Sequence, residues 1–176
     1  MGSVYRARDL HFPNVVKLVA VKEMVNLAPD PQLRKTVVEN FEREANILAT
    51  LTHPSIPSIF DYFSGDDRSY LVLEYVNGKD LEAVLRDSDG FISTAQVIAW
   101  AIELCDVLSF LHTHKPDKII FRDMKPSNVM IDSRGHIVLV DFGIAKQFQT
   151  GQKGTMIGTE GYSPPEQYRG EEKKRE

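Results

Sequence analysis

Four polar residues in the second half of the chain have the types and the spacing that phosphoryl transfer requires. Asp123, Lys125 and Asn128 stand close together in the sequence, and Asp141 opens an Asp-Phe-Gly sequence a few residues later. Transfer of a phosphoryl group from ATP needs a carboxylate that accepts the proton of the attacking hydroxyl, and a cation that offsets charge on the moving group. It also needs oxygen ligands that hold magnesium on the phosphates. These four residues would supply an acid, a cation and two metal ligands.

A long helix and a short hairpin are expected on either side of these residues. Apolar residues form a broad stripe from Thr94 to His112, which predicts a helix with Ser93 as its N-cap. Two apolar segments, 130–131 and 137–140, are separated by the turn sequence Asp-Ser-Arg-Gly. They predict a hairpin that delivers Asp141 to a loop.

The first half of the chain predicts an antiparallel sheet with one helix. Strands are expected over 15–24, which is rich in β-branched residues, and over 58–63 and 69–74, which are joined by the turn sequence Ser-Gly-Asp-Asp. Apolar residues at helical spacing predict an amphipathic helix over 33–51. We place the boundary between the two halves near residues 75–78.

The sequence Ile-Ile-Phe-Arg-Asp-Met-Lys-Pro-Ser-Asn at 119–128, followed by Asp-Phe-Gly, resembles the catalytic and metal-binding loops of the Ser/Thr protein kinases, most closely the bacterial type. The resemblance implies an α+β, two-lobed fold, with a small antiparallel sheet lobe containing one helix over 1–76 and an incomplete, mainly helical large lobe over 77–176. It also implies that the first strand and first glycines of the domain, and about its last third, are not in this sequence. Phe121 stands where the family usually has histidine.

The resemblance assigns a set of residues to ATP. Lys22, in Val-Ala-Val-Lys, resembles the lysine that contacts the α- and β-phosphates, and Glu44 its ion-pair partner, although Glu39 and Glu42 lie on the same expected helix. Taken alone, Lys22 is more typical of a solvated strand lysine, and Asp80 fits a surface acid about as well as a ribose ligand. The remaining residues implied at the nucleotide are Gly2, Val4, Ala20, Leu73, Glu74, Val76, Asp80 and Met130.

Catalytic and regulatory roles follow from the same resemblance. It implies that Asp123 is the general base, Lys125 stabilises the transferring phosphate, and Asn128 and Asp141 bind magnesium. Arg122 would meet a phosphorylated residue of the activation segment. The candidates in that segment are Thr155 and Thr150 for phosphorylation, and Thr159 for contact with the catalytic Asp and Lys.

Composition narrows the partners. The 176 residues carry a net charge of -4, which provides no basic field for nucleic acid or an anionic membrane. A single cysteine, Cys105, cannot form an intrachain disulfide and fits a reducing, cytoplasmic setting. No run approaches the roughly 18 consecutive apolar residues typical of a membrane span. The five histidines show no metal-ligand spacing, so solvated or packing roles are expected for them.

Two classes of function remain open from the sequence. The first is a Ser/Thr protein kinase that transfers the γ-phosphoryl group of Mg-ATP to protein Ser or Thr residues. The second is a catalytically impaired kinase fragment that binds nucleotide or a partner, for instance within a kinase dimer. A small-molecule kinase is the other enzymatic reading, but Lys125, Gly158-Thr159 and Pro164-Pro165-Glu166 favour protein substrates. ATP and Mg²⁺ are the expected cofactors.

Overall fold

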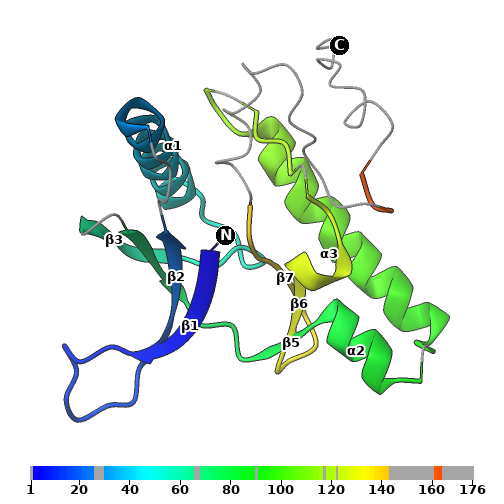
Figure 1. Ribbon diagram of the computed structural model, residues 1–176. Coiled ribbons are helices and arrows are strands. Elements are labelled where there is room, and N and C mark those ends of the chain that lie inside the picture. Colours follow the sequence, from blue (N-terminus) through cyan, green and yellow to red (C-terminus); the bar gives the residue numbers. More distant parts are fainter. Residues whose placement is uncertain are drawn as a thin grey trace. The chain divides into compact units, whose positions relative to one another are not determined.

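The computed structural model describes residues 2–25, 30–65, 68–89, 91–116, 118–121, 123–142 and 161–163. The chain divides into two compact units, Met1–Val76 and Asn77–Glu176. Each unit contains its own antiparallel sheet, and Figure 1 labels most of the strands and helices of both.

The first unit is built on a four-stranded sheet in the order β1-β2-β4-β3, with every neighbouring pair antiparallel. A β-bulge between Ile59 and Asp61 interrupts the pairing at the start of β3. The strands are β1 (Gly2–Arg8), β2 (Leu18–Val25), β3 (Ile59–Gly65) and β4 (Arg68–Glu74).

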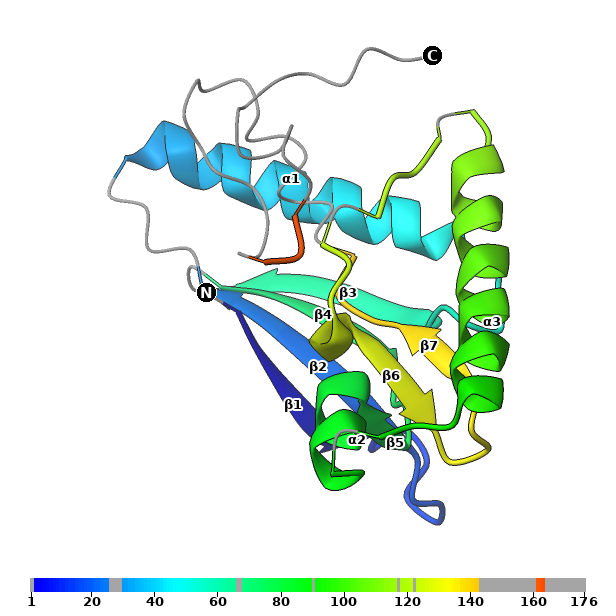
Figure 2. The ribbon, with the colours of Figure 1, turned by 90° about the vertical axis from the view of Figure 1, so that its right-hand side faces the viewer.

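One helix, α1 (Pro31–Ala49), covers the β3 and β4 side of this sheet, as Figure 2 shows. Its first turn is fixed by Asp30, whose side chain accepts the backbone N–H of Gln32. Phe41 is almost fully buried, and its ring lies 5.7 Å from that of Tyr62 on β3. This apolar seam holds the helix on one face of the sheet.

In the described part of the second unit, a three-stranded sheet, β5-β6-β7, is combined with three helical segments. Ser93 caps the long helix as expected, because its hydroxyl accepts the backbone N–H of Gln96 at 3.2 Å. Val107 and Leu111 of that helix are fully buried. In the hairpin, Leu139 is fully buried and Ile137 is 1% exposed. The elements are β5 (Gly78–Asp80), α2 (Leu81–Asp87), α3 (Thr94–Thr113), the 3-10 helix η1 (Pro126–Asn128), β6 (Val129–Asp132) and β7 (Ile137–Leu139).

The helix α3 also has an exposed apolar side, to which Val97, Ile98 and Ile102 belong. Among the described residues it is the one helix whose length and mean hydropathy of 1.5 would suffice to cross a membrane. The central helix of a globular domain has the same two properties, so length and composition alone do not assign α3 to a bilayer.

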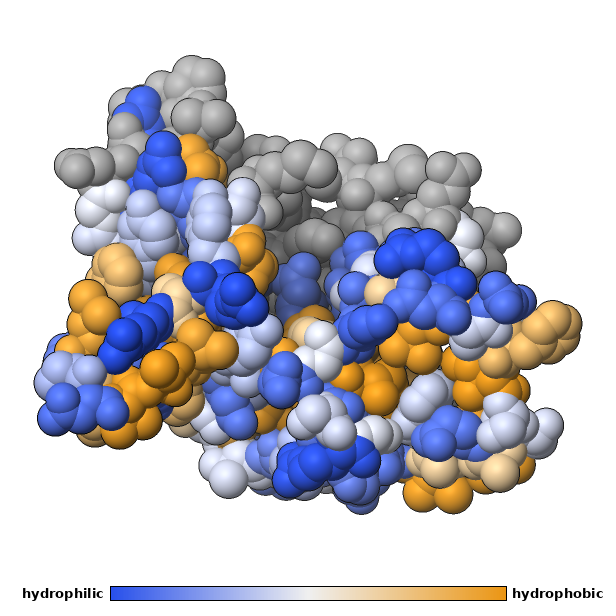
Figure 3. Space-filling model, turned by 90° about the horizontal axis from the view of Figure 1, so that it is seen from below, coloured by the Kyte–Doolittle hydropathy of each residue, from blue (hydrophilic) through white to orange (hydrophobic). Residues whose placement is uncertain are grey.

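One expectation about the first unit was wrong, and one of its strands was not predicted. The strand expected over 15–24 begins only at Leu18, because Val15 and Val16 belong to the connection between β1 and β2 and are 59% and 71% exposed. Figure 3 shows apolar side chains at the left of the face seen from below, where this connection lies in Figure 1. No strand was expected before residue 15, yet Gly2–Arg8 forms the edge strand β1 and pairs with β2 along its whole length.

Candidate active site

Three of the four chemistry-bearing residues lie together in the second unit. The Asp123 and Asn128 side chains are buried, and the Asn128 amide nitrogen donates to the Asp123 main-chain carbonyl at 2.8 Å and to its carboxylate Oδ2 at 3.3 Å. Lys125 Nζ lies 3.5 Å from the same carboxylate oxygen. The backbone folds this way because η1 turns the chain back, with the Asn128 N–H donating to the Lys125 carbonyl. A carboxylate is thereby fixed between an amide and a cation.

The Asn128 side chain fits the role of a metal ligand. Both partners of its nitrogen are oxygen acceptors, so the amide orientation is fixed by chemistry. Its Oδ1 oxygen then faces away from Asp123, and no hydrogen bond to it is recorded within the described residues, although the side chain is only 5% exposed. A buried amide oxygen of this kind is a suitable ligand for a hard cation such as Mg²⁺.

Asp141 follows directly from the hairpin that Asn128 begins. The N–H of Val140 donates to the Asn128 carbonyl at 3.0 Å, which ties the two ends of the β6–β7 hairpin together. Asp141 has a φ of 60°, a left-handed conformation that few residues other than glycine adopt. Such conformations concentrate at functional sites, where surrounding structure maintains them. Immediately afterwards, the Phe142 ring packs edge-on against the Phe121 ring, with 5.3 Å between their centroids.

In the first unit, strand register gathers four of the residues assigned to the nucleotide on one face of the sheet. Val4 pairs with Lys22, and Ala20 pairs with both Arg6 and Leu73. Since directly paired residues, and residues two apart, point to the same face, Val4, Ala20, Lys22 and Leu73 share it. Tyr62, which packs against α1, is paired with Leu71 on that face too. On this face, α1 therefore covers the half of the sheet formed by β3 and β4. The half that contains β1 is less covered, and Val4 there is 66% exposed.

Backbone contacts limit what the segment after β4 can offer to a base. The N–H of Glu74 donates to the Ser58 carbonyl at 2.8 Å. The backbone of Glu74 could therefore meet adenine only through its carbonyl oxygen, which would accept a hydrogen bond from the base. Val76 is partly buried. Met130 lies on β6 opposite Asp80, whose side chain caps α2 by accepting the Ala83 N–H at 2.7 Å. A helix cap is thus a third role for Asp80, beside the ribose ligand and the surface acid.

Several residues assigned from the sequence lie outside the described part of the molecule. These are Arg122, Thr150, Thr155 and Thr159. The side chain of Glu44 also falls outside it, so its pairing with Lys22 stays a prediction. The other two acids of α1 have partners in the first unit, since Glu42 accepts from the Tyr62 hydroxyl at 3.1 Å and Glu39 lies 3.7 Å from Lys35.

Sequence reasoning predicted the turn of the β6–β7 hairpin but assigned no role to Trp100 or Glu103, which contact it. His136, expected to be solvated or to have a packing role, bonds to Glu103 through its ring at 2.9 Å. The only signal in the sequence is that a tryptophan and a glutamate interrupt an apolar helical stripe three positions apart. No group of three or more His, Cys, Asp or Glu that could hold a metal ion is found among the described residues.

Comparison with known proteins decides the family. The family model of the protein kinase domain matches residues 1–176. The chain belongs to the protein kinase family. It is 32% identical to serine/threonine-protein kinase B of Synechocystis over 94% of its length, and 36% identical to serine/threonine-protein kinase PknB of Mycolicibacterium smegmatis over 97%. Among eukaryotic relatives, it is 34% identical to Aurora/IPL1-related protein kinase 2 of Caenorhabditis elegans over 96%.

A solved structure supports the fold independently. The apo form of PpkA-294 superposes with a TM-score of 0.75 at 21% sequence identity, over 95% of this chain and 63% of that one. The protein-kinase fold expected from the sequence is thereby confirmed. The chain spans 30%, 27% and 52% of the lengths of the three relatives named above.

Proposed function

We propose that this chain carries the catalytic residues of a Ser/Thr protein kinase, which transfers the γ-phosphoryl group of Mg-ATP to a serine or threonine hydroxyl of a protein. The observation that carries the proposal is the buried Asp123 carboxylate, held between the Asn128 amide at 3.3 Å and Lys125 Nζ at 3.5 Å. Relatives in the family are named serine/threonine-protein kinases, which supports the same conclusion.

The proposed step uses Asp123 as the base. Its carboxylate accepts the proton of the attacking hydroxyl, the hydroxyl oxygen forms a bond to the γ-phosphorus, and the bond from that phosphorus to the β-phosphate oxygen breaks. ADP leaves with the electron pair of the broken bond. Lys125, whose Nζ lies 3.5 Å from the Asp123 carboxylate, would offset negative charge on the transferring group.

Magnesium, when bound, neutralises charge on the phosphates and orients them. The buried Asn128 Oδ1 and the exposed Asp141 carboxylate, which are oxygen donors at the same end of the β6–β7 hairpin, would hold it. In the first unit, Lys22 would meet the α- and β-phosphates, while Val4, Ala20 and Leu73 would contact the base from their common face of the sheet. Both sets are assigned to one nucleotide by the family resemblance.

A phosphotransfer assay tests the proposal. The chain is incubated with Mg-ATP labelled at the γ-phosphate and with a mixed-sequence protein substrate such as casein, and phosphoamino acids are identified after hydrolysis. We expect label on serine and threonine, and its loss in Asp123→Asn, which keeps the shape of the side chain and its contact with Asn128. Binding of Mg-ATP with no transfer, at any enzyme concentration, would instead support a catalytically impaired nucleotide-binding fragment.

Regulation through the activation segment is part of the proposal. Arg122 directly precedes the base, so a phosphate on Thr155 that paired with it would couple segment order to the active site. We expect active protein to carry phosphate on Thr155 and Thr155→Ala to lose most activity. Unmodified Thr155 in fully active protein, detected by mass spectrometry, would refute this mode of control. The chain's single cysteine is in keeping with a cytoplasmic location for such an enzyme.

A further inference from the structure

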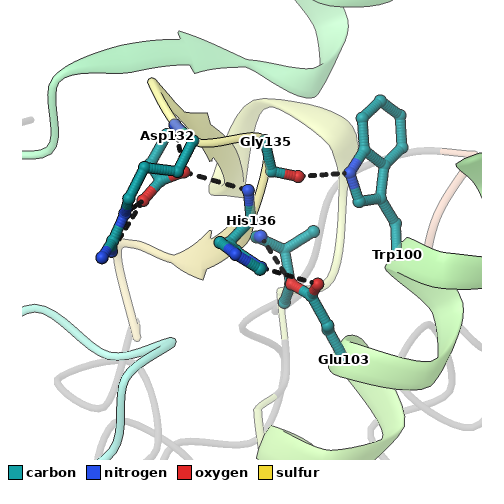
Figure 4. Close-up of polar contacts among 7 residues, drawn as sticks. Trp100, Glu103, Asp132, Gly135 and His136 are labelled. Atoms are coloured by element: carbon teal, nitrogen blue, oxygen red, sulfur yellow. Dashed lines mark hydrogen bonds and ion pairs between the residues drawn. The ribbon is translucent and has the colours of Figure 1, made fainter.

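Two side chains of α3 hold the turn of the β6–β7 hairpin. Trp100 Nε1 donates to the Gly135 carbonyl at 2.9 Å, and the Glu103 carboxylate accepts from both the His136 ring and the Ile137 N–H, each at 2.9 Å. Figure 4 shows both side chains reaching from the helix to this turn. Trp100 and Glu103, three positions apart on one face of α3, are called the α3 clamp below.

The turn that the clamp holds is itself well fixed. The Asp132 carboxylate accepts the N–H groups of Arg134 and His136, each at 2.9 Å, and Gly135 takes a φ of 90° that other residues rarely adopt. Burial acts to raise the pKa of Asp132, but the hydrogen bonds from His136 and Arg134 outweigh it and hold the pKa below the ordinary value of 3.8. A force on the turn is therefore transmitted to the whole hairpin.

The opposite end of the hairpin carries both proposed magnesium ligands. Asn128 immediately precedes β6, and Asp141 comes two residues after β7. At about 3.3 Å per residue, the four residues from the turn to this end span roughly 13 Å. A tilt of about 5° at the turn would move that end by roughly 1 Å, a displacement that can cost on the order of 100-fold in rate.

Apolar packing between α3 and the rest of the second unit restrains this tilt less sharply than hydrogen bonds do. Val107 and Leu111 are fully buried, but burial is non-directional and tolerates small rotations of a packed strand. Hydrogen bonds require particular distances and angles. Among the described contacts between α3 and the hairpin turn, the three hydrogen bonds of the clamp are the ones that restrain the direction of the hairpin.

We propose that Trp100 and Glu103 are positioning residues for the metal. By fixing the turn of the β6–β7 hairpin, they set where Asn128 and Asp141 present their oxygens at its other end. The inference rests on the proposed function, because it takes Asn128 and Asp141 as magnesium ligands.

Metal affinity is the decisive measurement. Mn²⁺, a paramagnetic substitute for Mg²⁺, is titrated in the presence of a non-hydrolysable ATP analogue, and free Mn²⁺ is followed by electron paramagnetic resonance. The variants are Glu103→Ala, Glu103→Gln and, as a matched control, Val107→Ala, which removes buried apolar atoms from the same helix and leaves the three hydrogen bonds of the clamp in place. All measurements are made at a temperature at which circular dichroism shows every variant folded.

We expect Glu103→Ala to weaken Mn²⁺ binding about 10-fold, the lower end of the range for groups that orient metal ligands. Glu103→Gln should stay within about 3-fold of the parent chain, because its amide oxygen can still accept the Ile137 N–H. Val107→Ala should lower the unfolding temperature and leave Mn²⁺ affinity unchanged. The same affinity in Glu103→Ala and the parent, or an equal loss in Val107→Ala, would overturn the clamp and leave the proposed function standing. If the parent chain itself binds no Mn²⁺ with nucleotide, the proposed function falls, and the clamp falls with it.

Discussion

Replacing Gly78 by alanine tests whether the approach of β5 to β6 is as close as the structure shows. A Cβ atom at this position would lie 2.0 Å from the Ile131 carbonyl oxygen, 2.8 Å from its carbonyl carbon and 2.9 Å from the Asp132 Cα. All three are backbone atoms, so no side-chain rotation can relieve the clash. The strand β5 would have to leave β6, which breaks up a ladder of three residue pairs.

The loss of stability in Gly78→Ala follows from those contacts. Losing two or three ladder hydrogen bonds at about 1 kcal/mol each, with backbone displacement in addition, gives roughly 2–4 kcal/mol of lost stability. For a chain of this size, that lowers the unfolding temperature by about 5–15 °C. Because Asp80 lies on the same short strand, the Michaelis constant for ATP should rise as well.

Gly65→Ala is the matched control, since nothing lies within 4 Å of a Cβ at that position. It should change stability by less than about 1 kcal/mol, in either direction. Thermal unfolding followed by circular dichroism measures both variants. Equal unfolding temperatures for the two would refute the close approach of β5 to β6.

Two further predictions concern single carboxylates. Glu23 is buried on β2, and hydrogen bonding from Arg68, aided by two tyrosine hydroxyls, lowers its pKa against the effect of burial. Its contribution to stability is therefore complete above its ordinary value of 4.5 and is lost as pH falls through the lower folded-state pKa. In urea denaturation, the difference in unfolding free energy between the parent chain and Glu23→Gln should narrow as the pH falls through the folded-state pKa of Glu23. A difference that does not depend on pH would contradict a lowered pKa for Glu23. For Asp123→Asn, steady-state kinetics should show kcat reduced by about 100- to 10,000-fold with little change in the Michaelis constant for ATP, and a small effect on kcat would exclude Asp123 as the base.

Helices and hairpins with strong local signals could be predicted from the sequence. The helix α3 was expected over 94–112 and is observed as Thr94–Thr113, because a capping serine and a long apolar stripe define it locally. The β6–β7 hairpin was likewise found from its turn sequence, which places glycine where the backbone is left-handed. Such signals depend only on neighbouring residues, so no tertiary information is needed to read them.

Elements whose stability comes from their partners were missed. The edge strand β1 contains two arginines and exposes Val4 and Tyr5, so it has no buried alternating face, and its pairing with β2 defines it instead. The helix α2 spans seven residues, too few for a clear period, and depends on the cap from Asp80. Conversely, Val15 and Val16 have high β-propensity but lie exposed in a connection, because propensity alone does not secure a partner strand.

The candidate site also has a part that local sequence predicts and a part that depends on contacts between distant residues. Residue types and spacing pointed to Asp123, Lys125, Asn128 and Asp141. These residues are close together in the sequence, so their side chains and spacing can be compared directly with what the reaction requires. The contact of Glu103 with His136 joins residues 33 positions apart, and nothing local predicts it. That distant bond is the structural observation on which the proposed positioning of the magnesium ligands rests.

Thermal unfolding with and without saturating Mg-ATP tests the central claim most directly, with Asp141→Ala as the control. A ligand at about 100 times its dissociation constant adds roughly 2.7 kcal/mol to the stability of the native state. We therefore expect the unfolding temperature of the parent chain to rise by about 5–10 °C, and that of Asp141→Ala to rise much less. An unfolding temperature that Mg-ATP leaves unchanged in the parent chain would contradict the assignment of these residues to a nucleotide and its metal.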